Sequence, residues 1–320
     1  MTELLPRARK WSRVLAVGAL ASSRLPVGRA GSVGVQQAVV LGALALGMPH
    51  GAADTELLRS AAAGSVRRHV ALAVAYAALG VGSTMVVRRG GGRVERAVLL
   101  ASAAHFGEGE LACWRLPPRV SLMGTVLRMA AATLTTVGLP AAVGTANRRP
   151  AEIGVSGALT TTPPRGMGDR TGLELLRDPA TRRVLAPLTG LAGAATAALA
   201  LAGDREAAQD SALLGCLALL APPATAFATY FGGWHALRHT ARVVDALVAD
   251  GQLPVQRSLP GAIGTLGRRS GWAAAVGLVA AGGLAAADPE NASDNAFAAV
   301  LGLTMPHMTT VALQLTRRGR

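Results

Sequence analysis

Apolar runs recur along the whole chain and are separated by short stretches that hold most of its charged residues. Most of the runs approach the ~20 residues that a helix needs to cross ~30 Å of hydrocarbon. They lie at residues 35–48, 70–87, 97–114, 121–143, 184–203, 211–230, 272–287 and 296–315. This pattern predicts an all-α, polytopic membrane bundle of about eight spans, and seven to ten spans are compatible with it.

Several of these runs are rich in Ala and Gly rather than Leu. Small residues allow helices to pack closely within a membrane. Pro49 and Pro306 interrupt two of the runs. A proline inside a span releases backbone groups, which are tolerated only beside a buried or water-filled cavity. We therefore expect helix breaks at both positions.

The composition supports a membrane protein and argues against nucleic-acid binding. The chain has 320 residues, of which 51% are hydrophobic and 16% are charged, outside the range of an ordinary soluble domain. Its net charge is +14, but the basic residues are dispersed among loops, and aromatic residues make up only 3% of the chain. A nucleic-acid surface would need a basic patch with stacking aromatics. We expect no nucleic-acid partner.

The charge distribution predicts the topology through the positive-inside bias. The basic segments are 7–13, 88–93, 148–183, 257–269 and 317–320, whereas the connectors 203–210 and 288–295 are acidic. Threading eight spans with both termini in the cytoplasm places most basic loops inside and the acidic connectors outside. Two loops do not follow the positive-inside bias in this threading, because it places their arginines outside. One loop contains Arg59, Arg67 and Arg68, and the other contains Arg115 and Arg119. The predicted location is the cell membrane.

Three regions follow from this threading. Residues 1–33 form a cytoplasmic or interfacial segment, because Arg24 and Arg29 follow its short apolar patch too closely for a signal peptide. Residues 34–315 form the membrane domain, and residues 316–320 are a basic tail. Residues 147–183 are expected to be a flexible loop within the domain, with a helical turn near residues 172–176.

Five of the six histidines lie in or at the ends of apolar runs: His50, His105, His235, His239 and His307. Polar side chains are expensive in hydrocarbon and are usually paired or functional. On a helix, His235 and His239 stand one turn apart on one face, so both rings can reach one metal ion. His69 lies beside Arg67 and Arg68 and is interpreted as a solvated loop residue.

Two interpretations of the histidines remain open. Each one alone could be a hydrogen-bonding group between helices, but several buried neutral imidazoles would leave many polar atoms unsatisfied, whereas a metal satisfies one nitrogen of each ring. Asp54, Glu108 and Glu110 lie close in sequence to His50 or His105 and could hold the opposite ring N–H groups. Alternatively, Asp54 and Glu110 cap helices or pair with loop arginines.

The sequence around the histidines excludes two classes of metalloenzyme. The glutamate that follows the first histidine of a zinc metalloprotease is absent, and so are the clustered histidine boxes of membrane di-iron desaturases. An all-imidazole site with few carboxylates suits a single iron(II) or copper centre, and ligand softness does not separate the two metals.

The motifs Pro49-His-Gly-Ala-Ala-Asp54, His105-Phe-Gly-Glu108, Trp234-His-Ala-Leu-Arg-His239 and Pro306-His-Met308, in this order, resemble the Brp/Blh family of bacterial and archaeal β-carotene 15,15′-dioxygenases. The resemblance implies an iron(II) enzyme that uses O2 to cleave β-carotene at its central double bond into two molecules of retinal. It places the metal ligands on His50, His105, His235 and His239. His307 becomes a further catalytic residue, either a ligand or a partner of one. Glu110 stands where the family commonly has aspartate.

Phe106, Tyr230, Phe231 and Trp234 lie next to these histidines in sequence and either pack against the polyene or fill the core. Tyr230 and Trp234 are also candidates for supporting the metal ligands. The eight-span threading, however, places His50 and His235 toward opposite sides of the membrane. If the two bind one ion, the span boundaries are wrong.

The expected partners are a lipid-soluble carotenoid, the lipid bilayer and a retinal-binding acceptor protein. Two other functions fit parts of the pattern. One is a transporter with a buried metal or proton site in broken helices, which would function without O2. The other is a membrane protein that binds a carotenoid or retinal without catalysis. Turnover separates both from the enzyme.

Overall fold

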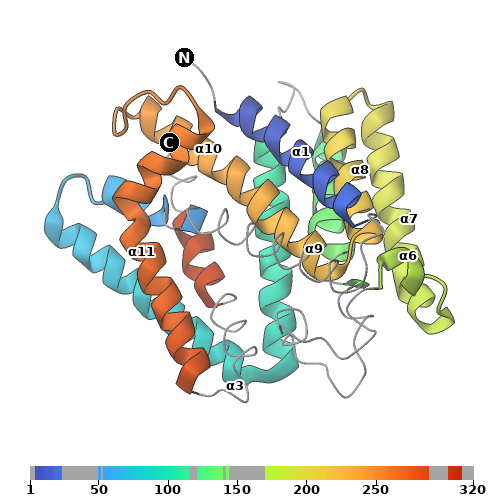
Figure 1. Cartoon of the computed structure of the whole chain (residues 1–320), viewed down its shortest axis with the longest axis horizontal. Coiled ribbons are helices and arrows are strands. Elements are labelled where there is room, and N and C mark those ends of the chain that lie inside the picture. Colours follow the sequence, from blue (N-terminus) through green and yellow to red (C-terminus); the bar gives the residue numbers. More distant parts are fainter. Residues whose placement is uncertain are drawn as a thin grey trace.

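A computed structural model describes residues 4–23, 50–51, 53–114, 121–139, 142–143, 170–287 and 302–311. Within these ranges all regular secondary structure is helical, which confirms the predicted all-α class (Figure 1). The main elements are α1 (Leu5–Ser22), α3 (Val66–Cys113), α4 (Leu122–Thr133), η1 (Leu134–Gly138), α6 (Gly172–Leu175), α7 (Pro179–Leu201), α8 (Arg205–Leu220), α9 (Pro223–Ala228), η4 (Thr229–Ala236), α10 (Leu237–Ala249) and α11 (Leu259–Ala287). Residues 53–61 and 302–311 are also helical. The break expected at Pro306 is wrong, because the helix at 302–311 continues through this proline, whereas Pro49 lies outside the described residues.

Two helical stretches in the described ranges are long and apolar enough to cross a membrane, Val66–Gly90 and Pro179–Leu201. Only 17% and 22% of their most apolar windows are buried, so most of these side chains face outward, as contact with lipid requires. Leu122–Gly138 is apolar but shorter. The predicted run at residues 35–48 lies outside the described residues. Membrane association is therefore supported, while the number of spans stays a prediction.

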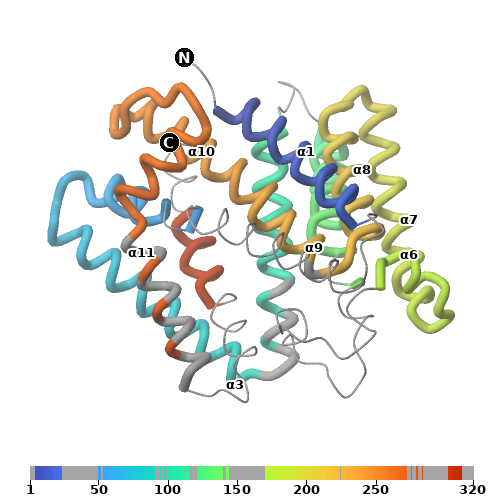
Figure 2. Tube along the Cα trace, in the orientation of Figure 1, coloured from blue at the N-terminus to red at the C-terminus, as the bar shows by residue number. Residues whose placement is uncertain are grey.

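The expected loop around residues 88–93 is wrong, because α3 continues through it. Figure 2 shows that α3 descends along one side of the molecule, bends, and then rises through its centre. A side chain on Gly90 would lie 2.2 Å from a methyl carbon of Val94, so glycine permits a curvature that another residue would obstruct. A hydropathy window detects the charges here but not the continuity of the helix.

The run at residues 211–230 is not one span. α8 ends at Leu220, and Pro223 occupies the first turn of α9, so the Pro222-Pro223 pair separates two helices. α9, η4 and α10 then follow each other without a break. The π-helical segment η4 contains His235, the first histidine of the HxxxH pair formed by His235 and His239. π-Helical segments often occur at functional sites.

The predicted topology is wrong around the connector 203–210. Asp204 caps α8, and most of the supposed loop forms the first turns of that helix. Arg9 forms an ion pair with Glu206, and Arg13 forms one with Asp210 at 2.7 Å. The N-terminal segment and this connector therefore meet directly, whereas the threading placed them on opposite sides of the membrane.

The expected helical turn near residues 172–176 is confirmed as α6, which begins with a capping box between Thr171 and Glu174. The predicted bounds of the flexible loop, 147–183, extend too far, because Asp178 caps α7 and that helix already begins at Pro179. Residues 144–169 lie outside the described residues. α7 and α8 run side by side at one end of the molecule (Figure 1).

α1 packs across η4, α10 and α8, so at least this part of segment 1–33 belongs to the helical core (Figure 1). Ala8, Ala16 and Ser12 are completely buried. A side chain on Gly233 would lie 3.3 Å from Leu15, so this glycine lets the two helices approach closely. The place of the segment relative to the membrane surface stays a prediction.

Candidate metal centre

Five imidazole rings from separate segments meet in one buried cluster. His50 lies at the start of a helical stretch, His105 is on α3, His235 is on η4, His239 is on α10, and His307 is in the helix at 302–311. None of the five residues is more than 8% exposed. The predicted histidines are therefore brought together from four parts of the chain that are far apart in sequence.

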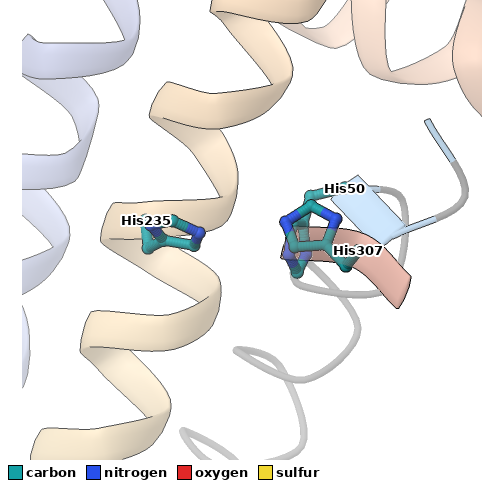
Figure 3. A group of neighbouring side chains, drawn as sticks. All are labelled: His50, His235 and His307. Atoms are coloured by element: carbon teal, nitrogen blue, oxygen red, sulfur yellow. The ribbon is translucent and has the colours of Figure 1, made fainter. Parts of the chain in front are cut away.

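The distances between the rings define a compact group. The centroid of His50 lies 5.5 Å from that of His235, 5.7 Å from that of His239 and 5.0 Å from that of His307. His105 lies 5.1 Å from His307 and 5.8 Å from His235. His50, His235 and His307 each offer a ring nitrogen within 4.8 Å of the other two. Figure 3 shows His235 projecting from η4 toward His50 and His307.

His235 and His239 are arranged as their spacing predicts. Their ring planes differ by only 22° and their centroids lie 5.9 Å apart. The proximity of His50 to both rings shows that the predicted span boundaries, and not the clustering of the histidines, were wrong.

The pattern of unpaired nitrogens fits a metal site. The Nε2 atoms of His105, His235, His239 and His307 are buried and have no hydrogen-bond partner among the described residues. A buried polar atom without a partner costs about 1–3 kcal/mol. Four such atoms from one cluster would be a large penalty, which a cation accepting their lone pairs would remove. The donor set suits iron, copper, zinc or nickel.

His307 is held by a carboxylate on its other nitrogen. Its Nδ1 lies 2.9 and 3.0 Å from the two carboxylate oxygens of Asp54, and the hydroxyl of Tyr76 donates to the same carboxylate at 2.7 Å. This arrangement fixes the ring and leaves Nε2 as the available lone pair, as in many metal-binding histidines. Asp54 was predicted to hold a ring N–H of the histidine cluster, and its carboxylate does so for His307 rather than for the nearby His50 in sequence. No signal in the sequence pointed to Tyr76.

We expect Asp54→Asn to weaken metal binding about 10–100-fold, because an amide cannot polarise the His307 ring as a carboxylate does. Tyr76→Phe should have a smaller effect, since it removes one hydrogen bond and leaves the carboxylate in place. The metal affinity of the purified protein, measured by competition with a chelator, checks both. Glu174→Gln, at an exposed position of α6 where glutamine can still close the capping box, is the control and should match the wild type.

Glu110 and Glu108 do not serve the histidines as expected. The carboxylate of Glu110 accepts from Trp234 Nε1 at 3.1 Å and pairs with Arg238 at 3.1 Å. Glu108 is half-buried and, within the described ranges, forms no hydrogen bond or ion pair with a histidine. Trp234 likewise belongs to this polar network, with the Arg238 guanidinium 3.8 Å above its ring.

The remaining aromatic residues border the cluster. The ring centroid of Phe106 lies 4.7 Å from that of His235, and the ring centroid of Tyr230 lies 5.5 Å from that of Phe106. On another side, Phe231 lies 5.2 Å from His50 and stacks on Phe227, which is 39% exposed. Phe227 and Phe231 thus connect the surface to the histidines. Tyr230 contacts the site through its ring.

His69 lies outside the cluster, as expected, but in the first turn of α3 and not in a loop. The helix at 302–311 reaches the cluster by crossing α3 closely, since a side chain on Gly302 would lie 2.7 Å from backbone atoms of Thr84. This crossing places the centroid of the His307 ring 5.0 Å from that of His239 on α10.

Comparison with known proteins places these residues in a family. The model of the family described as Beta-carotene 15,15'-dioxygenase matches residues 41–314. No curated protein and no solved structure matches the chain significantly. The matched range contains the five clustered histidines, Asp54 and Arg238, and it begins after α1.

Proposed function

This chain belongs to the beta-carotene 15,15′-dioxygenase family, and from this membership we propose that it cleaves β-carotene, or a related carotenoid, centrally with O2 to give retinal. The observation that carries the proposal is the buried group of four imidazole Nε2 atoms without partners inside the matched range. Such a group favours a metalloenzyme over a protein that only binds a carotenoid.

We propose that His50, His105, His235 and His239 hold iron(II), with His307 as a further ligand oriented by Asp54. When bound, iron(II) supplies the electrons that make O2 reactive toward a double bond. Neutral imidazole ligands leave the positive charge of the ion uncompensated, and Asp54 is the one carboxylate hydrogen-bonded to a clustered histidine within the described residues. The His307–Asp54 pair keeps the Nδ1 proton in place, so that Nε2 faces the cluster.

The surroundings of the cluster suit a long hydrocarbon. Phe106 and Phe231 place aromatic rings beside His235 and His50, where they can pack against a polyene. The burial of the histidines excludes bulk water from reactive species. Because the substrate is dissolved in lipid, we propose that the protein lies in the cell membrane and that the carotenoid enters from the bilayer past Phe227. Transfer of retinal to an acceptor protein stays a prediction.

The proposed reaction balances without a further reductant. The central carbon–carbon double bond breaks, each of its carbons gains one oxygen atom of O2, and two aldehydes result. One O2 should therefore be consumed for every two molecules of retinal. Both aldehyde oxygens should also come from O2, and labelling with 18O2 distinguishes this reaction from a monooxygenase route, in which one of the two oxygens would come from water.

Metal removal tests this proposal. We expect that detergent-purified protein treated with a chelator loses retinal formation, because the unpaired imidazoles alone cannot activate O2, and that iron(II) restores it while zinc(II) does not. Retinal and O2 consumption are measured together on β-carotene micelles. Cleavage at the original rate after complete iron removal, or under anaerobic conditions, would refute the iron-dependent dioxygenase.

A further inference from the structure

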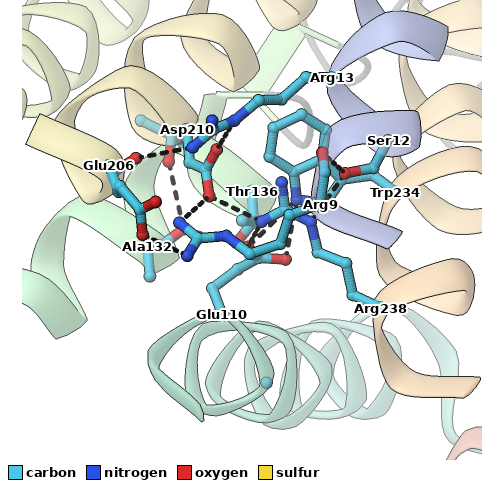
Figure 4. Close-up of polar contacts among 12 residues, drawn as sticks. Arg9, Ser12, Arg13, Glu110, Ala132, Thr136, Glu206, Asp210, Trp234 and Arg238 are labelled. Carbon is cyan, nitrogen blue, oxygen red and sulfur yellow. Dashed lines mark hydrogen bonds and ion pairs between the residues drawn. The ribbon is translucent and has the colours of Figure 1, made fainter. Parts of the chain in front are cut away.

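The N-terminal helix α1 lies outside the range matched by the family, yet it contributes to a buried polar network next to the histidines. The network joins Arg9, Ser12 and Arg13 of α1 to Glu110 of α3, Glu206 and Asp210 of α8, Trp234 of η4 and Arg238 of α10 (Figure 4). Ser12, Glu110, Asp210, Trp234 and Arg238 are each at most 1% exposed. Charged groups this deep are tolerated only when they are paired, so every member depends on the others.

Arg238 is the centre of this network. Its guanidinium donates to Asp210 at 2.8 Å, to Glu110 at 3.1 Å and to the Ser12 hydroxyl at 2.8 Å. The central carbon of the guanidinium also lies 3.8 Å from the centroid of the Trp234 ring, over its face. One side chain thus connects α1, α3, α8 and α10.

The network is directly coupled to the metal-binding helices. Trp234 and Arg238 are each adjacent in sequence to a clustered histidine, His235 and His239, and they repeat the same four-residue spacing. Both bind Glu110, which lies five residues after His105 on α3. The Glu110 contacts therefore fix the register between the helix of His105 and the helix of the HxxxH pair.

α1 supplies the charges that keep this arrangement neutral. Arg13 pairs with Asp210 at 2.7 Å, and Arg9 reaches Asp210 at 3.3 Å and also pairs with Glu206. Without these two arginines, Glu110 and Asp210 would have only Arg238 to balance them. The start of α1 is anchored as well, because the backbone N–H groups of Leu4 and Leu5 donate to Asp245 on α10.

We propose that α1 is a strap that positions the metal site, with Arg9, Ser12 and Arg13 acting through Arg238 on the HxxxH helix. This inference rests on the proposed function of the histidine cluster. Within the described ranges, none of the three forms a hydrogen bond or ion pair with a clustered histidine. They are positioning residues that hold the ring nitrogens of His235 and His239 at the correct distance from His105.

Metal release from the full-length protein in detergent tests the proposal. The variants are Arg13→Gln, which removes a charge, and Ser12→Ala, which removes only the hydroxyl that accepts from Arg238. Arg13→Lys is the conservative variant. Lys10→Ala is the matched control, because Lys10 is a basic residue of the same helix on its exposed side. Each protein is loaded with cobalt(II), its ligand-field spectrum is recorded, and the transfer of the ion to a chelator is timed.

We expect Arg13→Gln and Ser12→Ala to release cobalt about 10-fold faster than the wild type and to change its spectrum, as loss of groups that orient metal ligands does. Arg13→Lys should recover part of the wild-type rate, and Lys10→Ala should match the wild type. If Ser12→Ala and Arg13→Gln keep the wild-type spectrum and release rate and only lower the melting temperature, α1 is merely structural support and the proposal is overturned.

The metal readout keeps this inference separate from the proposed reaction. A wild-type protein that binds cobalt tightly but makes no retinal when loaded with iron would refute the reaction, while the comparison of release rates would still decide the role of α1.

Discussion

Replacing His235 or His239 with alanine is expected to abolish retinal formation and to reduce bound iron far below one ion per chain. Both rings are buried and both Nε2 atoms lack partners in the described part of the chain. Alanine removes a candidate metal ligand, and no other imidazole on that helix face can take its place. The remaining histidines would hold the ion in an altered geometry with lower affinity.

His69→Ala is the matched control for these variants, because it removes an imidazole from α3 that is outside the cluster. Iron per chain is measured by elemental analysis of the purified proteins, and retinal formation by chromatography. Wild-type iron content and wild-type turnover in both His235→Ala and His239→Ala would contradict the assignment of the site.

Arg238→Met is expected to have the largest effect on stability. The substitution leaves Glu110 and Asp210 buried with their main partner removed, and breaking one partner of a buried ion pair typically costs about 3–5 kcal/mol. The thermal transition in detergent should fall sharply, and the protein should accumulate poorly in membranes. Retinal formation should fall with it, because the contact between α3 and the HxxxH helix is lost.

Two comparisons separate this effect from a general sensitivity to arginine loss. Arg205→Met removes an exposed arginine at the start of α8 and should change stability by less than about 0.5 kcal/mol. Adding Glu110→Gln and Asp210→Asn to Arg238→Met removes the unpaired charges and should recover part of the loss. An Arg238→Met protein as stable as the wild type would show that the network does not hold the helices together.

The histidine site could be predicted from the sequence because its signal is local. A histidine in an apolar run is conspicuous, and the spacing of His235 and His239 alone places both rings on one helix face. His50, His105 and His307 could be added because each is anomalous in the same way. Which carboxylate serves which ring could not be predicted, since Asp54 reaches His307 across the fold and not its neighbour His50.

The helix boundaries and the polar network around Arg238 could not be predicted from the sequence. Arg9 and Arg13 were interpreted as positive-inside charges and Asp210 as part of an acidic loop, because a hydropathy pattern assigns charges to water. In the structure these groups neutralise each other inside the bundle. Charge pairing between distant segments is a property of the fold, so no window along the chain can detect it. The continuous helix at Gly90 was missed for a similar reason.

Pigment analysis in living cells tests the central claim most directly. The wild-type chain and His239→Ala are expressed in a bacterial host that accumulates β-carotene, membrane expression is confirmed for both, and the extracted pigments are separated against a retinal standard. We predict that retinal appears and β-carotene declines with the wild type alone. Intact β-carotene in cells with confirmed wild-type protein, or equal retinal from His239→Ala, would contradict central cleavage at the histidine cluster.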